Sequence, residues 1–153
     1  MPDLIAIVRI RSLIDRHPDV RKTVDLLKLR RINTCVIYPD SESLRGMLKL
    51  ASQVVTYGEI DKATLVELLK KRGRTIGDKP LNEELLKKNG YNSFEELADE
   101  IFKTGKIPSF IKPFFRLNPP KGGFKRSTKK MIVDKGELGY RGKDINNLIQ
   151  RML

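Results

Sequence analysis

The sequence contains no tryptophan, one cysteine (Cys35) and one histidine (His17). A single cysteine excludes an internal disulfide, and the shortage of sulfur and imidazole ligands predicts no metal site and no cofactor. A catalytic Ser-His-Asp or Cys-His arrangement would need His17, which precedes a proline in a charged segment. We expect His17 to lie in a loop and Cys35, within the β-branched run TCVIY, to lie in the core. P-loop, dinucleotide-binding and HExxH patterns are also absent, so we interpret the chain as a non-enzyme.

Long apolar runs are missing as well. The run LIAIV at residues 4–8 is far shorter than the roughly 20 residues that a membrane span needs. No signal-peptide pattern opens the sequence. We therefore expect a soluble cytoplasmic protein without membrane contacts, and 153 residues suit a single domain.

Positive charge, in contrast, is abundant. The formal net charge is +12 and the pI is about 9.9, values that favour a polyanionic partner, first of all a nucleic acid. The charge is also segregated along the chain. Residues 1–57 hold ten basic and six acidic side chains, residues 58–115 eleven and ten, and residues 116–153 ten and three. This distribution predicts that the two ends contact the polyanion and the middle does not.

The periodicity of the first sixty residues predicts a β-α-β-α-β unit. Residues 4–10 are expected to form a strand with apolar side chains on both faces, followed by a helix over about 19–29 and a strand over 34–38. A second helix should follow an N-cap at Asp40 or Ser41, and residues 53–57 should form the third strand. Two helices cover only one face of such a sheet, so part of the remaining chain should cover the other.

Residues 61–153 change character. Helices are predicted after Asp61, around residues 85–86 before Gly90, and from Phe94, where Ser93 and Glu96 match a capping box. A last helix is expected over the apolar positions 145, 148, 149 and 152. The predicted fold class is α+β: a small sheet backed by two helices, plus a helical and basic-loop C-terminal extension. We expect one domain, with residues 1–60 as a core unit and 61–153 as an extension packed on it.

The segment Arg116–Met131, RLNPPKGGFKRSTKKM, holds six Lys or Arg residues and no acidic one. Its adjacent prolines and its glycines, Gly122 and Gly123, exclude a helix interior. The prolines should stiffen the segment, and the glycines should let backbone N–H groups turn toward an anion. We interpret the 116–131 segment as a stiff cationic loop that binds phosphate; the alternative is an unstructured basic loop that only adds solubility.

Arginine dominates the basic residues of the N-terminal third. Seven of the ten basic side chains in residues 1–57 are Arg, whose planar guanidinium matches phosphate oxygens in pairs. Several of these side chains follow the first strand or end the first helix, where cations also complement the helix dipole.

Several motifs resemble one known family. Arg11-Ser12-Leu13-Ile14, Leu29-Arg30-Arg31-Ile32-Asn33, Leu44-Arg45-Gly46-Met47 and Val54-Val55 resemble the ribosomal protein L-thirty family of the large subunit. The later PPKGG and the terminal INNLIQRML are similar to its long archaeal and eukaryotic members, the latter called ribosomal protein L-seven. The eukaryotic forms carry a longer basic N-terminal arm, whereas this sequence begins directly at MPDLIAIVRI. The resemblance therefore favours the archaeal form.

The resemblance implies a structural constituent of the large ribosomal subunit, without catalytic activity, that binds 23S-type ribosomal RNA near the 5S RNA and contacts neighbouring large-subunit proteins. Two alternatives stay open: a non-ribosomal RNA-binding protein, and a ribosome-assembly adapter that uses the charge-balanced middle helices. No small-molecule substrate is expected. The candidate RNA-binding residues are Arg9, Arg11, Arg16, Lys28, Arg30, Arg31, Arg45, Arg116, Lys121, Gly122, Gly123, Lys125, Arg126, Lys129, Lys130, Arg141 and Lys143.

Overall fold

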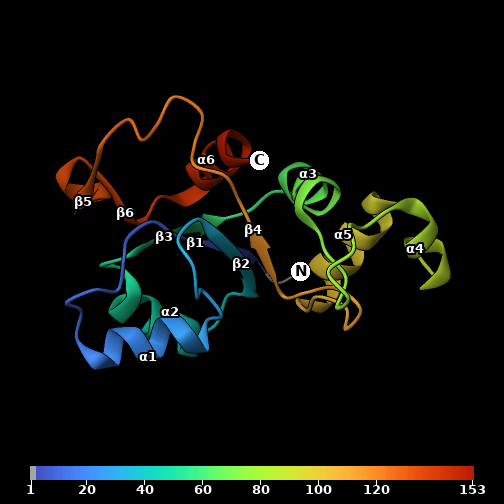
Figure 1. The fold of residues 1–153 in the computed structure, drawn as a ribbon, viewed down its shortest axis with the longest axis horizontal. Coiled ribbons are helices and arrows are strands. Elements are labelled where there is room, and N and C mark those ends of the chain that lie inside the picture. Colours follow the sequence, from blue (N-terminus) through green and yellow to red (C-terminus); the bar gives the residue numbers. More distant parts are fainter. Residues whose placement is uncertain (1–2) are drawn as a thin grey trace.

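The structure, a computed structural model, describes residues 3–153 and contains a six-stranded sheet with helices on both faces (Figure 1). The elements in chain order are β1 (Leu4–Arg9), α1 (Pro18–Leu26), β2 (Thr34–Pro39), α2 (Glu42–Ala51), β3 (Val55–Glu59), α3 (Lys62–Arg72), α4 (Glu83–Lys88), α5 (Phe94–Thr104), β4 (Phe114–Arg116), β5 (Ser127–Met131), β6 (Gly136–Tyr140) and α6 (Ile145–Met152), with short 3₁₀ turns at Ile132–Asp134 and Gly142–Asp144. The predicted α+β class is confirmed.

The first sixty residues form the predicted β-α-β-α-β unit. Strand β1 lies between β2 and β3 and pairs antiparallel with both, with Ile7 opposite Val36 on one side and Tyr57 on the other. Strand β3 begins at Val55 and not at residue 53, because the N–H of Val54 closes a turn onto the carbonyl of Ala51. The predicted strands and helices are therefore present, with boundaries shifted by a few residues.

Alternation along β1 gives the sheet two apolar faces. Ile5 and Ile7 pack with buried side chains of α1 and α2, whereas Leu4, Ala6 and Val8 pack in a second cluster. Many other members of that second cluster come from α3, α5 and α6; Figure 1 shows α3 and α6 on the opposite side of the sheet from α1 and α2. Part of the extension therefore packs on the second face of the sheet.

Side-chain caps begin α2 and α5, as predicted, whereas Asp61, the N-cap residue of α3, makes no side-chain cap. The Ser41 hydroxyl accepts from the N–H of Leu44 at 3.1 Å, and the Ser93 hydroxyl accepts from the N–H of Glu96 at 3.2 Å. The Glu96 carboxylate reaches back to the N–H of Asn92, one residue before the cap, so the capping box is shifted by one position. His17, expected in a loop, caps α1: its Nδ1 accepts from the N–H of Asp19 at 3.1 Å.

The extension also contributes three strands, which the sequence did not predict. Strand β4 pairs antiparallel with β2, β6 pairs parallel with β3, and β5 pairs parallel with β6 through an irregular register. The expected three-stranded sheet is thus six-stranded, in the order β4-β2-β1-β3-β6-β5. The three strands were missed because β4 has only three residues, β5 is the polar sequence STKKM, and β6 contains two glycines.

Cys35 is fully buried and unpaired, as predicted. No helix within residues 3–153 combines the length and apolar character needed to cross a membrane. In the same residues, His, Cys, Asp and Glu side chains do not gather in groups of three that could hold a metal ion.

Candidate RNA-binding surface

The 116–131 segment is fastened to the end of α6. Asn118 N donates to the carbonyl oxygen of Met152, and Lys121 N donates to that of Arg151, both at 2.9 Å. The Arg151 guanidinium donates back to the carbonyl oxygen of Lys121 at 3.1 Å and to that of Gly123. Figure 1 shows this stretch running from β4 past α6 to β5. The backbone around the two glycines is therefore held by hydrogen bonds within the protein.

The two glycines are required by backbone conformation. Gly122 and Gly123 have φ angles of 76° and 73°, in the left-handed region that side chains with a Cβ rarely adopt. A Cβ added at either position would meet no atom within 4 Å, so crowding is not the reason. Gly123 N closes a turn onto the carbonyl oxygen of Pro120 at 2.9 Å. The loop thereby turns while its lysine side chains stay exposed.

A cavity of about 630 Å³ opens between the 116–131 segment and α6. Lys121, Lys125, Arg126 and Arg151 line it, with Arg141, Glu137 and Asp144. The first three cations are exposed and make no ion pair within the described residues. A cluster of free cations on a backbone held in place is suited to polyanion binding, because binding orders few additional groups. Arg151 was absent from the sequence-based set; its signal is only its position in the last turn of a helix.

Strand β5 extends this positive surface. Lys129 and Lys130 are exposed on β5, which forms one edge of the sheet. Lys143 is exposed in the 3₁₀ turn before α6. These three cations are available to a partner.

Arg141 has a different environment. Its guanidinium and the Glu137 carboxylate form an ion pair in which both side chains are about 5% exposed. Its Nε also donates to Thr56 Oγ1 at 2.8 Å, and the Glu137 carboxylate accepts from Arg126 N at 2.9 Å. Arg141 therefore joins β3 to β6 inside the protein, and its Nε and one terminal nitrogen are used there.

Arg9 is likewise inside the protein. It is 6% exposed, and its guanidinium donates to the carbonyl oxygens of Arg11 and Leu29, at 2.9 and 3.1 Å. Burial lowers the pKa of the Arg9 guanidinium. The arginine excess of the N-terminal third thus contains at least one structural arginine, which fixes the end of β1 to the turn between α1 and β2.

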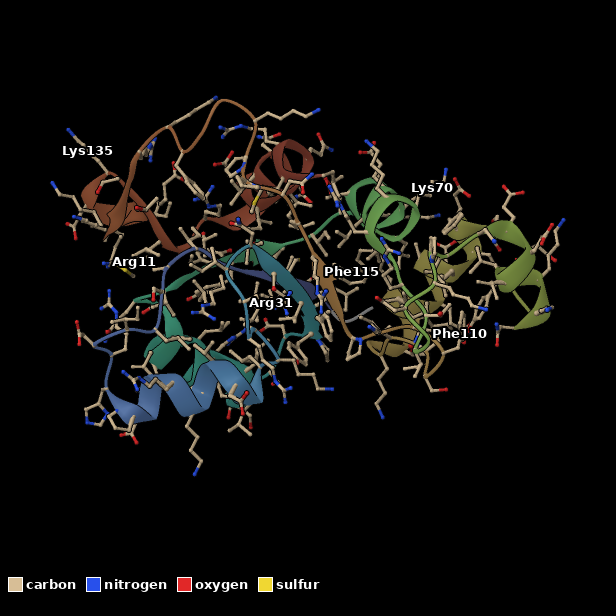
Figure 2. All side chains as sticks on the ribbon, viewed as in Figure 1. Arg11, Arg31, Lys70, Phe110, Phe115 and Lys135 are labelled. Carbon is tan, nitrogen blue, oxygen red and sulfur yellow. The ribbon has the colours of Figure 1, made fainter. Side chains whose placement is uncertain are left out.

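The other candidate cations of the N-terminal third make fewer hydrogen bonds within the protein than Arg9 does. Arg11 and Arg16 are half-buried, and Arg16 donates to the Gln53 side chain at 3.2 Å. Lys28, Arg30 and Arg31 are exposed in the turn between α1 and β2, where Arg30 pairs with Asp25 at 3.3 Å. Figure 2 shows Arg31 near the β2–β4 side of the sheet.

This turn and Arg116 are brought together by the sheet. Leu117 N donates to the carbonyl oxygen of Asn33 at 2.9 Å, and Arg116 lies opposite Thr34 in the β2–β4 pairing. Residues that are some eighty positions apart in sequence therefore contribute cations to one region, and this proximity depends on the unpredicted strand β4.

Arg45 is exposed on α2 but already has an anionic partner. Its Nε and one terminal nitrogen donate to the two Asp40 oxygens at 3.0 and 2.7 Å. This hydrogen-bonded pair lowers the pKa of Asp40 and raises that of Arg45. A phosphate would have to share or replace the Asp40 carboxylate.

Comparison with known proteins shows which proteins this chain resembles. Residues 5–55, which span β1 to the start of β3, match the family model described as ribosomal protein L30p/L7e. The chain is 53% identical to the large ribosomal subunit protein uL30 of Staphylothermus marinus, over all of both chains. It is 50% identical to the uL30 protein of Thermofilum pendens, covering 98% of this chain and 99% of the relative.

The chain belongs to the ribosomal protein L30p/L7e family. The expected relationship to long archaeal members is confirmed, since these archaeal relatives align over the extension as well as the β-α-β-α-β unit. The uL30 protein of Caldivirga maquilingensis is 48% identical, covering 98% of this chain and 91% of the relative. The 116–131 segment and α6 are therefore part of the family's long form.

Proposed function

We propose that this chain is a structural component of the large ribosomal subunit that binds 23S-type ribosomal RNA near the 5S RNA. Its place in the L30p/L7e family supports the ribosomal assignment. The positive surface supports the RNA contact: exposed Lys and Arg side chains are dispersed over several elements, as expected for binding to phosphates and sugars. Its location would be the cytoplasmic ribosome, among other large-subunit proteins.

One observation carries the RNA-binding part of the proposal. The backbone of residues 118–123 is hydrogen-bonded to Arg151 and Met152, and the exposed cations Lys121, Lys125 and Arg126 surround the adjoining cavity. A cationic loop that is already fixed loses little conformational entropy when RNA binds. We infer that the protein acts by neutralising and positioning folded RNA.

The candidate residues have three different roles in this proposal. The exposed cations of the 116–131 segment, together with Lys28, Arg30, Arg31 and Lys143, are assigned to phosphate contacts. Arg11 and Arg16 are half-buried and are assigned weaker phosphate contacts. Arg45 can bind a phosphate only if its hydrogen bonds to Asp40 are replaced. Arg9 and Arg141 are assigned to internal support, because their donors bind protein acceptors.

Sedimentation of cell extracts tests the proposal against its alternatives. We expect the native protein to co-migrate with large subunits at one copy per subunit and to remain bound after purification. An assembly adapter would instead be found on immature particles and leave the finished subunit. A non-ribosomal RNA-binding protein would sediment apart from both, and either result would reject the proposal.

A further inference from the structure

A second cationic cavity lies beside β4. Most of its lining residues come from the 58–115 region, whose basic and acidic residues are nearly equal in number. The cavity's volume is about 160 Å³, and its lining residues are Arg72, Arg74, Asp78, Lys112, Phe114 and Arg116. Only Arg116 was expected from the sequence to bind RNA. The net charge of the 58–115 region is close to zero because it also holds ten acidic residues. The sequence therefore did not predict a cationic cluster here, since it does not show that most of these acidic residues lie outside the cavity.

A glycine at the end of α3 places two of these arginines. Gly73 N donates to the carbonyl oxygen of Leu69 at 3.0 Å, and a Cβ on Gly73 would lie 2.4 Å from Leu81 Cδ1. A Cβ there would also lie 2.5 Å from the Leu69 carbonyl oxygen, a backbone atom that cannot move aside, so the position requires glycine. Arg72 and Arg74, on either side of Gly73, thereby reach the same cavity.

Backbone pairing brings the other cations to them. Lys112 N donates to the carbonyl oxygen of Arg74 at 2.8 Å, next to a bridge between Thr75 and Ile111. Strand β4 starts two residues after Lys112 and carries Phe114 and Arg116. The cavity is therefore formed by two stretches of the chain, residues 72–78 and 112–116, that backbone hydrogen bonding holds together.

The charges in the cavity are unbalanced. Four cations face a single carboxylate, Asp78, whose Oδ1 accepts from Lys112 Nζ at 3.0 Å. That hydrogen bond, with further attraction from Lys112, Arg74 and Arg116, lowers the pKa of Asp78. The Phe114 ring centroid lies 5.8 Å from both Lys112 Nζ and Arg116 Cζ, so the ring holds these two cations by cation–π contact.

Arg72 supplies a donor without an acceptor. Its Nε is the only buried side-chain nitrogen or oxygen in residues 3–153 that has no hydrogen-bond partner. A guanidinium stays charged, so it cannot relieve the missing bond by losing its proton. Buried donors are nearly always paired, and an acceptor that enters the cavity, such as a phosphate oxygen, would satisfy this N–H.

We propose that this cavity binds a phosphate group, with Arg72, Arg74 and Arg116 as donors and Lys112 shared with Asp78. The proposal deepens the proposed function, because a ribosomal RNA phosphodiester is the expected source of the phosphate. Free inorganic phosphate has the same chemistry, and the experiment separates the two. The cavity would add a contact from the middle of the chain to those of its two ends.

The test uses the full-length protein and the Arg72 Nε–Hε resonance in NMR spectra. Inorganic phosphate should shift this resonance in a saturable way, whereas chloride at the same ionic strength should not. A short RNA duplex should displace the phosphate. In parallel, Arg74→Gln/Arg116→Gln is compared with Lys87→Gln/Lys88→Gln, which removes the same charge from exposed positions on α4.

For protein-free large-subunit RNA, the cavity variant should lose affinity by at least about tenfold, since one charge-assisted contact already accounts for about that factor, while the α4 control keeps its affinity. Its salt dependence should also become shallower, by a log–log slope of about 1 for one lost phosphate. Phosphate saturation without displacement by RNA would support the site and assign it to free phosphate.

An Arg72 resonance that ignores both phosphate and RNA would overturn the inference, as would equal RNA affinities of the two variants. These results leave the sedimentation test unaffected. If the native protein does not co-migrate with large subunits but phosphate saturates Arg72, the proposed function fails and the phosphate site stands.

Discussion

Arg151 and Lys121 bind each other through reciprocal hydrogen bonds: Lys121 N donates to the Arg151 carbonyl oxygen at 2.9 Å, and the Arg151 guanidinium donates to the Lys121 carbonyl oxygen at 3.1 Å from a terminal nitrogen and at 3.3 Å from Nε. The Lys121 side chain takes no part in these bonds. Backbone atoms of Lys121 therefore fix the loop conformation, whereas its side chain supplies the charge. A mutation can remove the charge without removing these hydrogen bonds.

The first prediction uses that separation. Lys121→Glu/Lys125→Glu/Arg126→Glu should fold normally, because exposed charge changes usually alter stability by less than about 0.5 kcal/mol each. Incorporation into large subunits should fall, since each reversal replaces attraction to phosphate by repulsion, at a cost of about 1 kcal/mol even when screened. The measurement is subunit occupancy at equal expression.

The matched control reverses Lys70, Lys87 and Lys88, which are exposed on α3 and α4. Figure 2 shows Lys70 on α3, away from the 116–131 segment. Its ion pair with Glu95, at 3.7 Å between exposed side chains, contributes at most about 1 kcal/mol. Equal occupancy of the two triple variants at equal melting temperature would refute the assignment of the loop to RNA.

The second prediction concerns salt. If about seven phosphates are neutralised, the log–log slope of RNA affinity against salt concentration should lie near −5 to −6. A fourfold increase in salt should then weaken binding by about 4 kcal/mol. Filter binding or fluorescence titration with ribosomal RNA measures this directly. A slope shallower than about −2 would mean that base or shape contacts dominate.

The third prediction concerns the fragment 1–60. We expect it to unfold cooperatively, because it contains the complete β-α-β-α-β unit, but at a much lower temperature than the full chain. Without α3, α5 and α6, the apolar face of Leu4, Ala6 and Val8 is uncovered, and sixty residues make a marginal core. Calorimetry of the fragment at low temperature checks this. A non-cooperative melt would show that the extension is part of the folding unit itself.

The fourth prediction separates structural from RNA-binding arginines. Arg141→Met leaves the buried Glu137 carboxylate without its cation and should cost about 3–5 kcal/mol of folding free energy. The double variant Glu137→Leu/Arg141→Met should recover most of this loss, because it removes both buried charges. Urea unfolding of the single and double variants tests the pair. If Arg141→Met kept its stability and lost RNA affinity, Arg141 would belong to the RNA surface after all.

The fifth prediction concerns pH. Burial raises the pKa of the Cys35 thiol to about 12, whereas an unfolded cysteine titrates near pH 8.5. The contribution of the neutral thiol to stability is therefore complete below about pH 8.5 and is lost as the pH rises toward 12, by about 1.4 kcal/mol per pH unit. Unfolding free energies measured across this range should fall more steeply for the native protein than for Cys35→Ala. Parallel curves would contradict the assignment.

The sequence predicted the fold where side-chain periodicity determines it. Alternation along residues 4–10 predicted two apolar faces, and the helices that cover both faces followed from their leucine spacing. Strands β4 and β6 escaped prediction because pairing with β2 and β3, which are distant along the chain, makes them strands, and β5 escaped because its sequence is polar. Thr56, for example, lies opposite Gly139 in the β3–β6 pairing.

The sequence predicted which parts of the chain carry the positive charge, but not which cations lie close together in space or which are buried. Sequence reasoning correctly placed Lys121, Lys125 and Arg126 in one exposed loop, since they are close along the chain. It could not separate Arg9, which is buried among backbone carbonyls, from an exposed arginine such as Arg31. Nor could it bring Arg72 to Arg116, because that proximity exists only after β4 has paired with β2.

The sheet order carries one more consequence. Strands β2 and β3 would be the edges of the first sixty residues alone, and unpaired edges offer N–H and C=O groups to any other chain. In the full protein, β4 pairs with β2 and β6 pairs with β3, so both of these edges are covered. The replacement edges are a three-residue strand and a lysine-bearing strand of irregular register, both poor templates for intermolecular pairing. The extension therefore protects the protein against edge-to-edge aggregation before any RNA is bound.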